Sequence, residues 1–323
     1  MDELASPSVS VRPAALVCGS ISMWLEDLLS KFCVVEHCLA DNVEVSLDQV
    51  ERADLMILRS PHYISAETAR ATSRLRMVIR AGSGMEGLCA EALATRGVRV
   101  HRLNGAGPSV AEHGFGLLLS AARAIPRMQS ALKAGHWLKK EAHGIELHGK
   151  TLLIVGLGQV GRHVARIAEG LGLRLLIADR SPSKPEKQAA LDRLSSATCV
   201  SLAEGLAAAD FVMLCCSLNS TTAGMIDQHA LEQIKPGAIL VNVARAQIVE
   251  RDALQAALDS GRLAAAGLDV HYNEPIPDGD LLRDERIFAT PHIGAQTVEA
   301  RRRIEDEILA LVTAFARRER CDA

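Results

Sequence analysis

Short apolar segments of strand length alternate with longer amphipathic segments along almost the whole chain. In the first third, the pattern predicts helices at residues 21–32 and 65–74, and strands at 14–18, 34–38, 54–58, 77–79 and 98–100. A second series predicts strands at 151–155, 173–179, 211–215, 238–242, 264–269 and 287–289, with helices between most of them. Such alternation is typical of α/β proteins with parallel sheets.

Turn-forming residues separate the two series. The cluster Asn104-Gly-Ala-Gly-Pro108 predicts a domain boundary. Directly after it, Ser109 and Glu112 have the spacing of a capping box, so we expect a long helix from Ser109 to about residue 134 that crosses between domains. A charged amphipathic helix is expected at residues 297–318.

The predicted strand at 151–155 leads directly into a glycine-rich turn, Gly156-Leu-Gly158-Gln-Val-Gly161, and a helical pattern follows it. In this context the three glycines permit a tight turn, a close approach of a pyrophosphate and close packing of the helix on the strand. The free N–H groups and the dipole of that helix would bind the phosphates. This order of elements predicts a dinucleotide site.

The next predicted strand ends at Asp179, close to the spacing of about 20 residues at which an acid binds the adenosine ribose. Such an acid repels a 2′-phosphate, so NAD is favoured over NADP. Arg180 and Ser181 follow directly and could hold a 2′-phosphate, which keeps NADP open as an alternative.

Three later strands end in polar segments: Val241-Asn-Val-Ala-Arg245, then Leu268-Asp269-Val270 with Asn273-Glu274-Pro275, and Thr290-Pro-His292-Ile-Gly-Ala295. Open α/β sheets bind their ligands at the carboxyl ends of strands. Taken singly, each segment has an ordinary structural explanation: a surface arginine, a capping acid or a loop histidine. Together with the glycine-rich turn, they resemble the D-isomer-specific 2-hydroxyacid dehydrogenase family over nearly the whole chain.

This resemblance implies hydride transfer between NAD and C2 of a D-2-hydroxyacid or 2-ketoacid. The catalytic set would be Arg245, Glu274 and His292. Histidine titrates near neutral pH and can take the hydroxyl proton, while an arginine fork suits the substrate carboxylate. The cofactor-binding residues implied are Gly156, Gly158, Gln159, Val160, Gly161, Asp179, Cys216, Val243, Ala244, Asp269, Gly294 and Ala295, with Asp269 on the nicotinamide carboxamide.

The resemblance also implies a domain arrangement. A Rossmann-type, doubly wound cofactor domain at residues 105–295 would be inserted into a smaller flavodoxin-like α/β substrate domain, formed by residues 1–104 and 296–323. The family usually forms homodimers through the cofactor domain, including the long helix after Ser109.

Within the family the chain is most similar to the D-3-phosphoglycerate dehydrogenases, as a short form without their C-terminal regulatory domain. The similar segments are Leu58-Arg59-Ser60, Val78-Ile-Arg80-Ala-Gly-Ser83-Gly84 and Gly135-His-Trp137-Leu-Lys-Lys140. They imply phosphate binding by Arg59 and Arg80, with Lys139 reaching across a dimer. The predicted substrate-binding residues are Arg59, Ser60, Arg80, Ser83, Gly84 and Lys139. Alternatively, both arginines only brace strand ends.

The chain departs from that group near the substrate and nicotinamide loops, at Met85-Glu-Gly-Leu-Cys89, Ser217 and Ala246. These departures leave the substrate open. 3-Phosphoglycerate is one candidate, and glyoxylate or hydroxypyruvate, which would need no phosphate site, are the alternative. An NAD-sensing interaction protein resembling the transcriptional corepressors on this scaffold is a further alternative.

Composition excludes several other function classes. With 36 Lys and Arg against 39 Asp and Glu, the formal charge is −3, and aromatic residues make up 3%. Neither value favours nucleic-acid or membrane binding. The eight cysteines form no CxxC pair, and no metal site is expected. An acidic N-terminus and the absence of an 18-residue apolar run predict a cytoplasmic protein.

Overall fold

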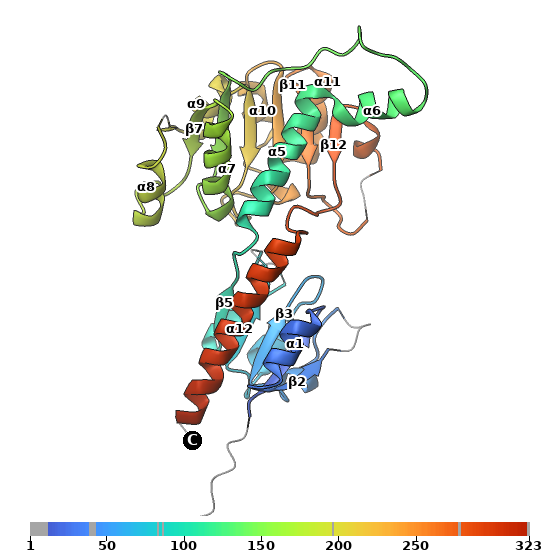
Figure 1. Cartoon of the computed structure of the whole chain (residues 1–323). Coiled ribbons are helices and arrows are strands. Elements are labelled where there is room, and N and C mark those ends of the chain that lie inside the picture. Colours follow the sequence, from blue (N-terminus) through green and yellow to red (C-terminus); the bar gives the residue numbers. More distant parts are fainter. Residues whose placement is uncertain are drawn as a thin grey trace, which may run out of the picture. The chain divides into compact units, whose positions relative to one another are not determined.

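The computed structural model describes residues 12–38, 43–82, 84, 85, 87–195, 197–276 and 279–321. The chain divides into two compact units, Met1–Ala106 with Arg301–Ala323, and Gly107–Ala300. Both units are α/β, and each has its own parallel sheet and its own apolar core (Figure 1). The division of the chain into substrate and cofactor domains at residues 104 and 295 stays a prediction.

In the described part of the larger unit, seven parallel strands follow the order β12-β11-β10-β9-β6-β7-β8. This is the doubly wound Rossmann order with one strand added beyond its last. The strands are β6 Thr151–Val155, β7 Arg174–Ala178, β8 Ala197–Cys199, β9 Phe211–Leu214, β10 Ala238–Asn242, β11 Leu263–Leu268 and β12 Ile287–Ala289. All but β8 are predicted from their apolar runs, whereas this edge strand is only three residues long and partly exposed, so it forms no such run.

Helices cover both faces of that sheet. Alternate residues of β6 point to opposite faces, so Leu152 and Ile154 join the core with α5 and α7, while Leu153 and Val155 join the core with α9, α10 and α11 (Figure 1). The helices are α5 Gly107–Arg123, α6 Ile125–Lys133, α7 Gln159–Gly170, α8 Pro185–Leu191, α9 Leu202–Ala208, α10 Gln228–Gln233 and α11 Arg251–Asp259, with short 3-10 helices at Ala246–Ile248 and Leu281–Arg283.

The long helix predicted after Ser109 differs from the structure at both ends. It begins at Gly107, because Pro108 is well suited to a first helical turn, and the capping-box prediction is therefore wrong. Ser109 lies inside the helix, where its hydroxyl forms a 2.8 Å hydrogen bond with that of Thr297. Near the other end, Ala124 adopts a left-handed conformation, with φ of 48°, and separates α5 from α6.

The smaller unit has a five-stranded parallel sheet in its described part, with the flavodoxin-like order β2-β1-β3-β4-β5. Its strands are β1 Ala14–Cys18, β2 Val34–His37, β3 Leu55–Leu58, β4 Met77–Arg80 and β5 Arg99–Arg102. One face packs against α1 Met23–Leu29 and α12 Val298–Cys321, whose residues from Arg301 onward belong to this unit. The other face packs against α2 Leu47–Val50, α3 Ala66–Ala71 and α4 Ala90–Thr95.

The predicted α/β class, with one Rossmann-type and one flavodoxin-like sheet, is confirmed. None of the helices in the described ranges is both long and apolar enough to span a membrane.

An aspartate closes the amino edge of each sheet in the same way. Asp54, just before β3, accepts a 2.7 Å hydrogen bond from the N–H of Ala14, the first residue of β1. Asp210, just before β9, accepts a 2.9 Å hydrogen bond from the N–H of Thr151, the first residue of β6, and pairs with Lys235 at 2.7 Å. Each acid thereby satisfies the first donor of a central strand.

Burial raises the pKa of Asp210, but its hydrogen bonds with Lys235 and Thr151 outweigh burial and hold the pKa below the usual range. A depressed folded-state pKa stabilises the fold above the unfolded value of about 3.9. This stabilisation is lost as pH falls through the folded value. We therefore expect Asp210→Asn to lower the free energy of unfolding by about 1 kcal/mol at pH 7 and by progressively less as the pH falls below about 4.

Urea unfolding followed by circular dichroism at pH 7 and at pH 3 checks this expectation. The exposed Asp252, which forms an ion pair with the neighbouring Arg251, provides the control Asp252→Asn. That control should change stability by less than about 0.5 kcal/mol. An equal loss for Asp210→Asn at pH 7 and at pH 3 would mean that its charge is not what stabilises the sheet edge.

Candidate active site

Three neighbouring strands bring the polar segments of the larger unit to one edge of its sheet. β10 pairs with β11 and β11 pairs with β12, all in parallel. Arg245 follows β10, Asp269 and Glu274 follow β11, and His292 follows β12. Because carboxyl ends of parallel strands meet at the same edge, segments far apart in the sequence are gathered there.

His292 and Glu274 are in direct contact. Nδ1 of His292 lies 2.7 Å from Oε2 of Glu274, and the other carboxylate oxygen accepts a 2.9 Å hydrogen bond from the N–H of His271. Burial raises the pKa of Glu274, but the hydrogen bonds from His292 and His271 outweigh it, so the pKa lies below the ordinary range. The ionised carboxylate fixes a proton on Nδ1, which leaves Nε2 as the nitrogen that can accept one.

Asp269 holds the loop that carries His292. Asp269 is buried, and its carboxylate accepts hydrogen bonds from the N–H groups of Ile293 and Gly294, both at 2.8 Å, and from the hydroxyl of Thr290 at 2.7 Å. The loop turns so tightly around it that His292 takes a left-handed conformation, with φ of 53°. The described contacts of Asp269 are thus to its own chain, and its predicted contact with a nicotinamide carboxamide stays a prediction.

The turn before Arg245 is held by a buried asparagine. Asn242 ends β10, and its side chain accepts from the N–H of Ala244 at 3.0 Å and donates to the carbonyl of Arg245 at 2.9 Å. Arg245 is half-buried, and its Nη1 donates to the Ala244 carbonyl at 2.6 Å. Asn242 therefore orients the backbone from which the guanidinium extends, a role that the sequence pattern does not reveal.

The glycine-rich turn has the form that a pyrophosphate requires. Gly156 has a φ of 96° and lies against Cys216, so a Cβ on Gly156 would come within 2.8 Å of the Cys216 backbone. A Cβ on Gly161 would overlap the Gly156 carbonyl oxygen. At Gly158, by contrast, no described atom lies within 4 Å of a Cβ position, which leaves open space at the start of α7. These residues fit a dinucleotide.

Asp179 is already paired in the structure. Its carboxylate accepts hydrogen bonds of 2.7 Å from the N–H groups of Leu157 and Ser181 and lies 2.5 Å from Nζ of Lys187 on α8. Burial raises its pKa, but the bond with Lys187 and the two backbone donors lower it below the usual range. The contact with Leu157 links the acid to the glycine-rich turn, and Lys187 is a neighbour that the spacing argument does not identify.

The remaining residues predicted to bind the cofactor lie on the same segments. Gln159 and Val160 open α7, while Val243 and Ala244 are buried after β10. Burial raises the pKa of Cys216 to about 11, so its thiol is protonated at neutral pH. Gly294 fits against Asp269, where a Cβ would come 2.8 Å from Oδ2, and Ala295 follows it. Their cofactor contacts stay predictions.

The two arginines predicted to bind phosphate differ in their surroundings. Arg80 donates to Ser60 Oγ at 2.8 Å and to the carbonyls of His62 and Gly84 at 3.3 Å, so it braces two loops. Nη1 of Arg59 is buried with no hydrogen-bond partner among the residues that the structure describes. Burial, and then the nearby Arg301, lower the pKa of Arg59, and the nearby Glu305 offsets this lowering only in part. A further anion would complete the compensation of this guanidinium.

Ser83 and Lys139 are two further residues predicted to bind the substrate. Ser83 lies outside the described residues. Lys139 lies in the exposed segment after α6. Both assignments stay predictions.

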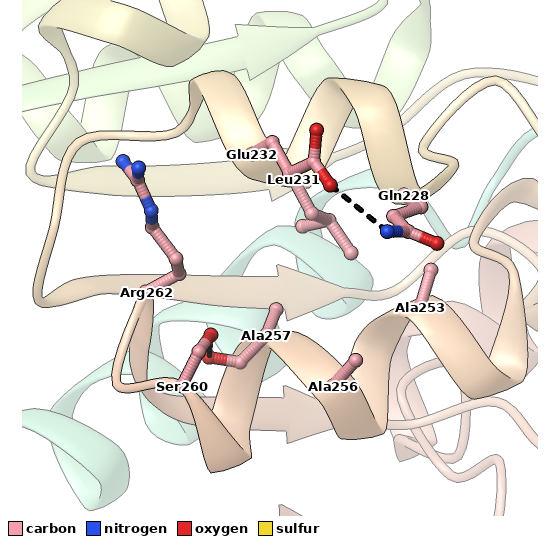
Figure 2. Close-up of a pocket in the computed structure, with 8 residues that line it drawn as sticks. All are labelled: Gln228, Leu231, Glu232, Ala253, Ala256, Ala257, Ser260 and Arg262. Atoms are coloured by element: carbon pink, nitrogen blue, oxygen red, sulfur yellow. Dashed lines mark hydrogen bonds between the residues drawn. The ribbon is translucent and has the colours of Figure 1, made fainter.

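A cavity of about 250 Å³ lies elsewhere in the larger unit, between α10 and α11 (Figure 2). Leu231 and alanines of α11 line it, and so do Gln228 and Glu232, which form a hydrogen bond with each other along α10. Of the predicted site residues that the structure describes, none lines this cavity.

Comparisons with known proteins agree with the geometry. A family model described as "D-isomer specific 2-hydroxyacid dehydrogenase, NAD binding domain" matches residues 115–294. A hydroxypyruvate reductase of Thermotoga maritima is 35% identical over 278 residues, which cover 85% of this chain and 87% of the relative. A D-3-phosphoglycerate dehydrogenase of Mycobacterium bovis is 36% identical over 281 residues, 84% of this chain. The chain spans only 52% of that second relative.

Solved structures are similar over both units. A glyoxylate reductase from Paecilomyes thermophila, 28% identical, has a TM-score of 0.84 and is matched over 93% of this chain and 94% of its own. The D-mandelate dehydrogenase of Rhodotorula graminis, also 28% identical, has a TM-score of 0.81, with 93% of each chain covered.

Two glycines of α7 provide a matched test of the turn. Gly161→Ala should lower the free energy of unfolding by about 2 kcal/mol, because the added methyl group meets the Gly156 carbonyl, and it should weaken NADH binding. Gly170→Ala, at the other end of the same helix, meets no described atom within 4 Å and should change stability by less than about 1 kcal/mol. Thermal unfolding and NADH fluorescence titration check both variants. Equal effects would contradict the assigned role of Gly161.

Proposed function

The chain belongs to the D-isomer-specific 2-hydroxyacid dehydrogenase family, and we propose that its His292–Glu274 pair removes the hydroxyl proton from C2 of a small D-2-hydroxyacid during oxidation. It is an NAD-dependent oxidoreductase acting on CH–OH groups. The single observation that carries the assignment of the residues is the 2.7 Å contact between Nδ1 and Oε2 at the carboxyl edge of the sheet.

The route of the proton follows from that contact. With Nδ1 protonated and bound to Glu274, Nε2 accepts the hydroxyl proton as the C2–H bond breaks, and the positive charge formed on the imidazole is stabilised by the adjacent carboxylate. In the reducing direction the same nitrogen returns the proton to the C2 oxygen. The lowered pKa of Glu274 keeps its carboxylate charged throughout the neutral range.

The reaction also requires that the substrate be held in a fixed position, and Arg245 is the residue assigned to hold it. A guanidinium can hold the C1 carboxylate through two parallel hydrogen bonds and polarise the C2 oxygen. Its backbone is set by the buried Asn242, so the planar fork starts from a rigid position.

When bound, NAD takes up or supplies the hydride at C2. The residues that would hold the dinucleotide are Gly158 and the first N–H groups of α7 for its pyrophosphate, and Asp179 for its ribose. The negative charge of Asp179 repels a 2′-phosphate, and the ion pair with Lys187 weakens that repulsion. NADP is therefore the alternative to NAD.

For the substrate, we propose an acid with a second anionic group, with 3-phosphoglycerate as the leading candidate. The buried Nη1 of Arg59, which has no partner in the described part of the chain, supports it. Hydroxypyruvate or glyoxylate is the second candidate, favoured by the bracing contacts of Arg80 and by the names of two similar proteins.

We further propose a homodimer in the cytoplasm. α6, which is described in full, has no buried residue, and Ile125, Leu132 and Trp137 expose 50%, 59% and 77% of their surface. Apolar side chains so exposed, next to Lys139, favour contact with a second copy. The cysteines with described side chains are free thiols, as is usual in a reducing compartment.

The catalytic assignment has a direct test. His292→Ala and Arg245→Ala should each lower kcat by at least about a hundredfold while NADH binding stays nearly intact. Steady-state kinetics with a panel of 2-ketoacids and fluorescence titration of NADH check these expectations. Near-normal turnover in either variant would remove its residue from the catalytic set. Tight NADH binding by the unmodified protein with no turnover of any acid would favour the NAD-sensing alternative.

The substrate class is tested with phosphohydroxypyruvate and hydroxypyruvate at matched concentrations. Arg59→Gln should raise KM for the phosphorylated acid about tenfold or more, because it removes a charged donor, and should change KM for the unphosphorylated acid much less. Arg52→Gln, on the exposed surface of the same unit, is the control. Equal changes for the two acids would make Arg59 structural.

A further inference from the structure

His113, in the middle of α5, reaches the buried carboxylate that holds the His292 loop. Its Nε2 lies 2.8 Å from Thr290 Oγ1 and 3.2 Å from Asp269 Oδ1. The neighbouring positions of α5, among them Ala111, Phe115 and Leu117, are buried and apolar. A polar side chain at this position needs a polar partner, and the structure provides one.

The directions of the hydrogen bonds follow from the inventory of donors. Thr290 has one hydroxyl proton, and Asp269 can only accept when ionised, so that proton goes to Asp269 Oδ1 at 2.7 Å. Thr290 Oγ1 can then accept but not donate toward His113. Nε2 of His113 therefore carries a proton that it shares between Oγ1 and Oδ1.

The N–H group of His113 completes the set of hydrogen-bond donors around the Asp269 carboxylate. Oδ1 receives the Thr290 hydroxyl, the Ile293 N–H and the His113 proton, while Oδ2 receives the Gly294 N–H. The packing here is tight, because a Cβ on Gly294 would lie 2.8 Å from Oδ2 and 3.5 Å from the His113 ring. A buried carboxylate needs such a complete shell of donors.

We propose that His113 is a positioning residue for the dehydrogenase reaction: it fixes Asp269 and Thr290 from the rigid helix α5 and thereby holds His292 in its strained, productive conformation. The proposal rests on the proposed function in that His292 is taken as the acid–base group. His113 acts through Asp269 and Thr290 and takes no part in the proton transfer itself. A misplacement of the catalytic ring by about 1 Å can cost up to about a hundredfold in rate.

A pair of substitutions separates this role from simple packing. His113→Phe keeps the ring volume and removes the donor, whereas His113→Gln can place an amide N–H near the position of Nε2. We expect His113→Phe to lower kcat about tenfold or more, by a larger factor than it raises the Kd of NADH, and His113→Gln to recover most of the loss. His229→Phe, an exposed histidine of α10, is the control and should keep its kcat.

Hydrogen exchange gives a readout that is independent of turnover. The amides of Ile293 and Gly294 are protected by Asp269, so their segment should exchange faster in His113→Phe than in His113→Gln or in the unmodified protein. This measurement tests the positioning role even if the protein turned over none of the acids, which separates its failure from that of the proposed function.

Thr290 supplies a second variant if His113→Phe does not fold. Thr290→Val removes the bridging hydroxyl at nearly constant volume, and Thr290→Ser retains it, so the first should lose rate and amide protection and the second should lose little. Normal kcat and normal exchange in His113→Phe or in Thr290→Val would overturn the proposal. Equal losses in His113→Phe and His113→Gln would also overturn it, since packing alone would then explain them.

Discussion

The candidate site depends on one buried carboxylate, that of Asp269. It sits just after β11, and three groups of the next strand's loop, the Thr290 hydroxyl and the N–H groups of Ile293 and Gly294, bind to it. A left-handed backbone at His292 costs a non-glycine residue about 1–2 kcal/mol. Several charge-assisted hydrogen bonds to the carboxylate offset that cost.

An aspartate at a strand end holds a neighbouring segment in the same way at three other places in the two sheets. Asp54 and Asp210 each stand just before one strand and satisfy the first N–H of its neighbour, and Asp179 stands just after a strand and binds the N–H of Leu157 in the adjoining turn. Parallel sheets leave backbone donors unpaired where strands begin and end. An aspartate from the adjacent strand satisfies them and fixes the relative position of two loops in one step.

Much of the fold can be predicted from the sequence, because buried parallel strands are continuous apolar runs. β6, β10 and β12 have the predicted bounds, whereas β8 escapes detection since its residues Ala197–Cys199 lie at an exposed sheet edge. The capping box at Ser109 is misleading because a proline one residue earlier already starts the helix. The first miss thus comes from the lack of a buried face, and the second from a neighbouring residue that starts the helix earlier.

For the site, the sequence supplies the residue types but not their partners. The motif carrying His292 is visible in the sequence, yet its contact with Glu274, 18 residues earlier, depends on β11 lying beside β12. His113 and Lys187 give no sequence signal, since each acts by approaching an acid that is distant along the chain. Both acids are thereby compensated by the protein's own cations or donors, so contacts within the chain restrain the loops of the site. Loops restrained in this way cost less to order on binding, and the binding energy remains for orienting the substrate.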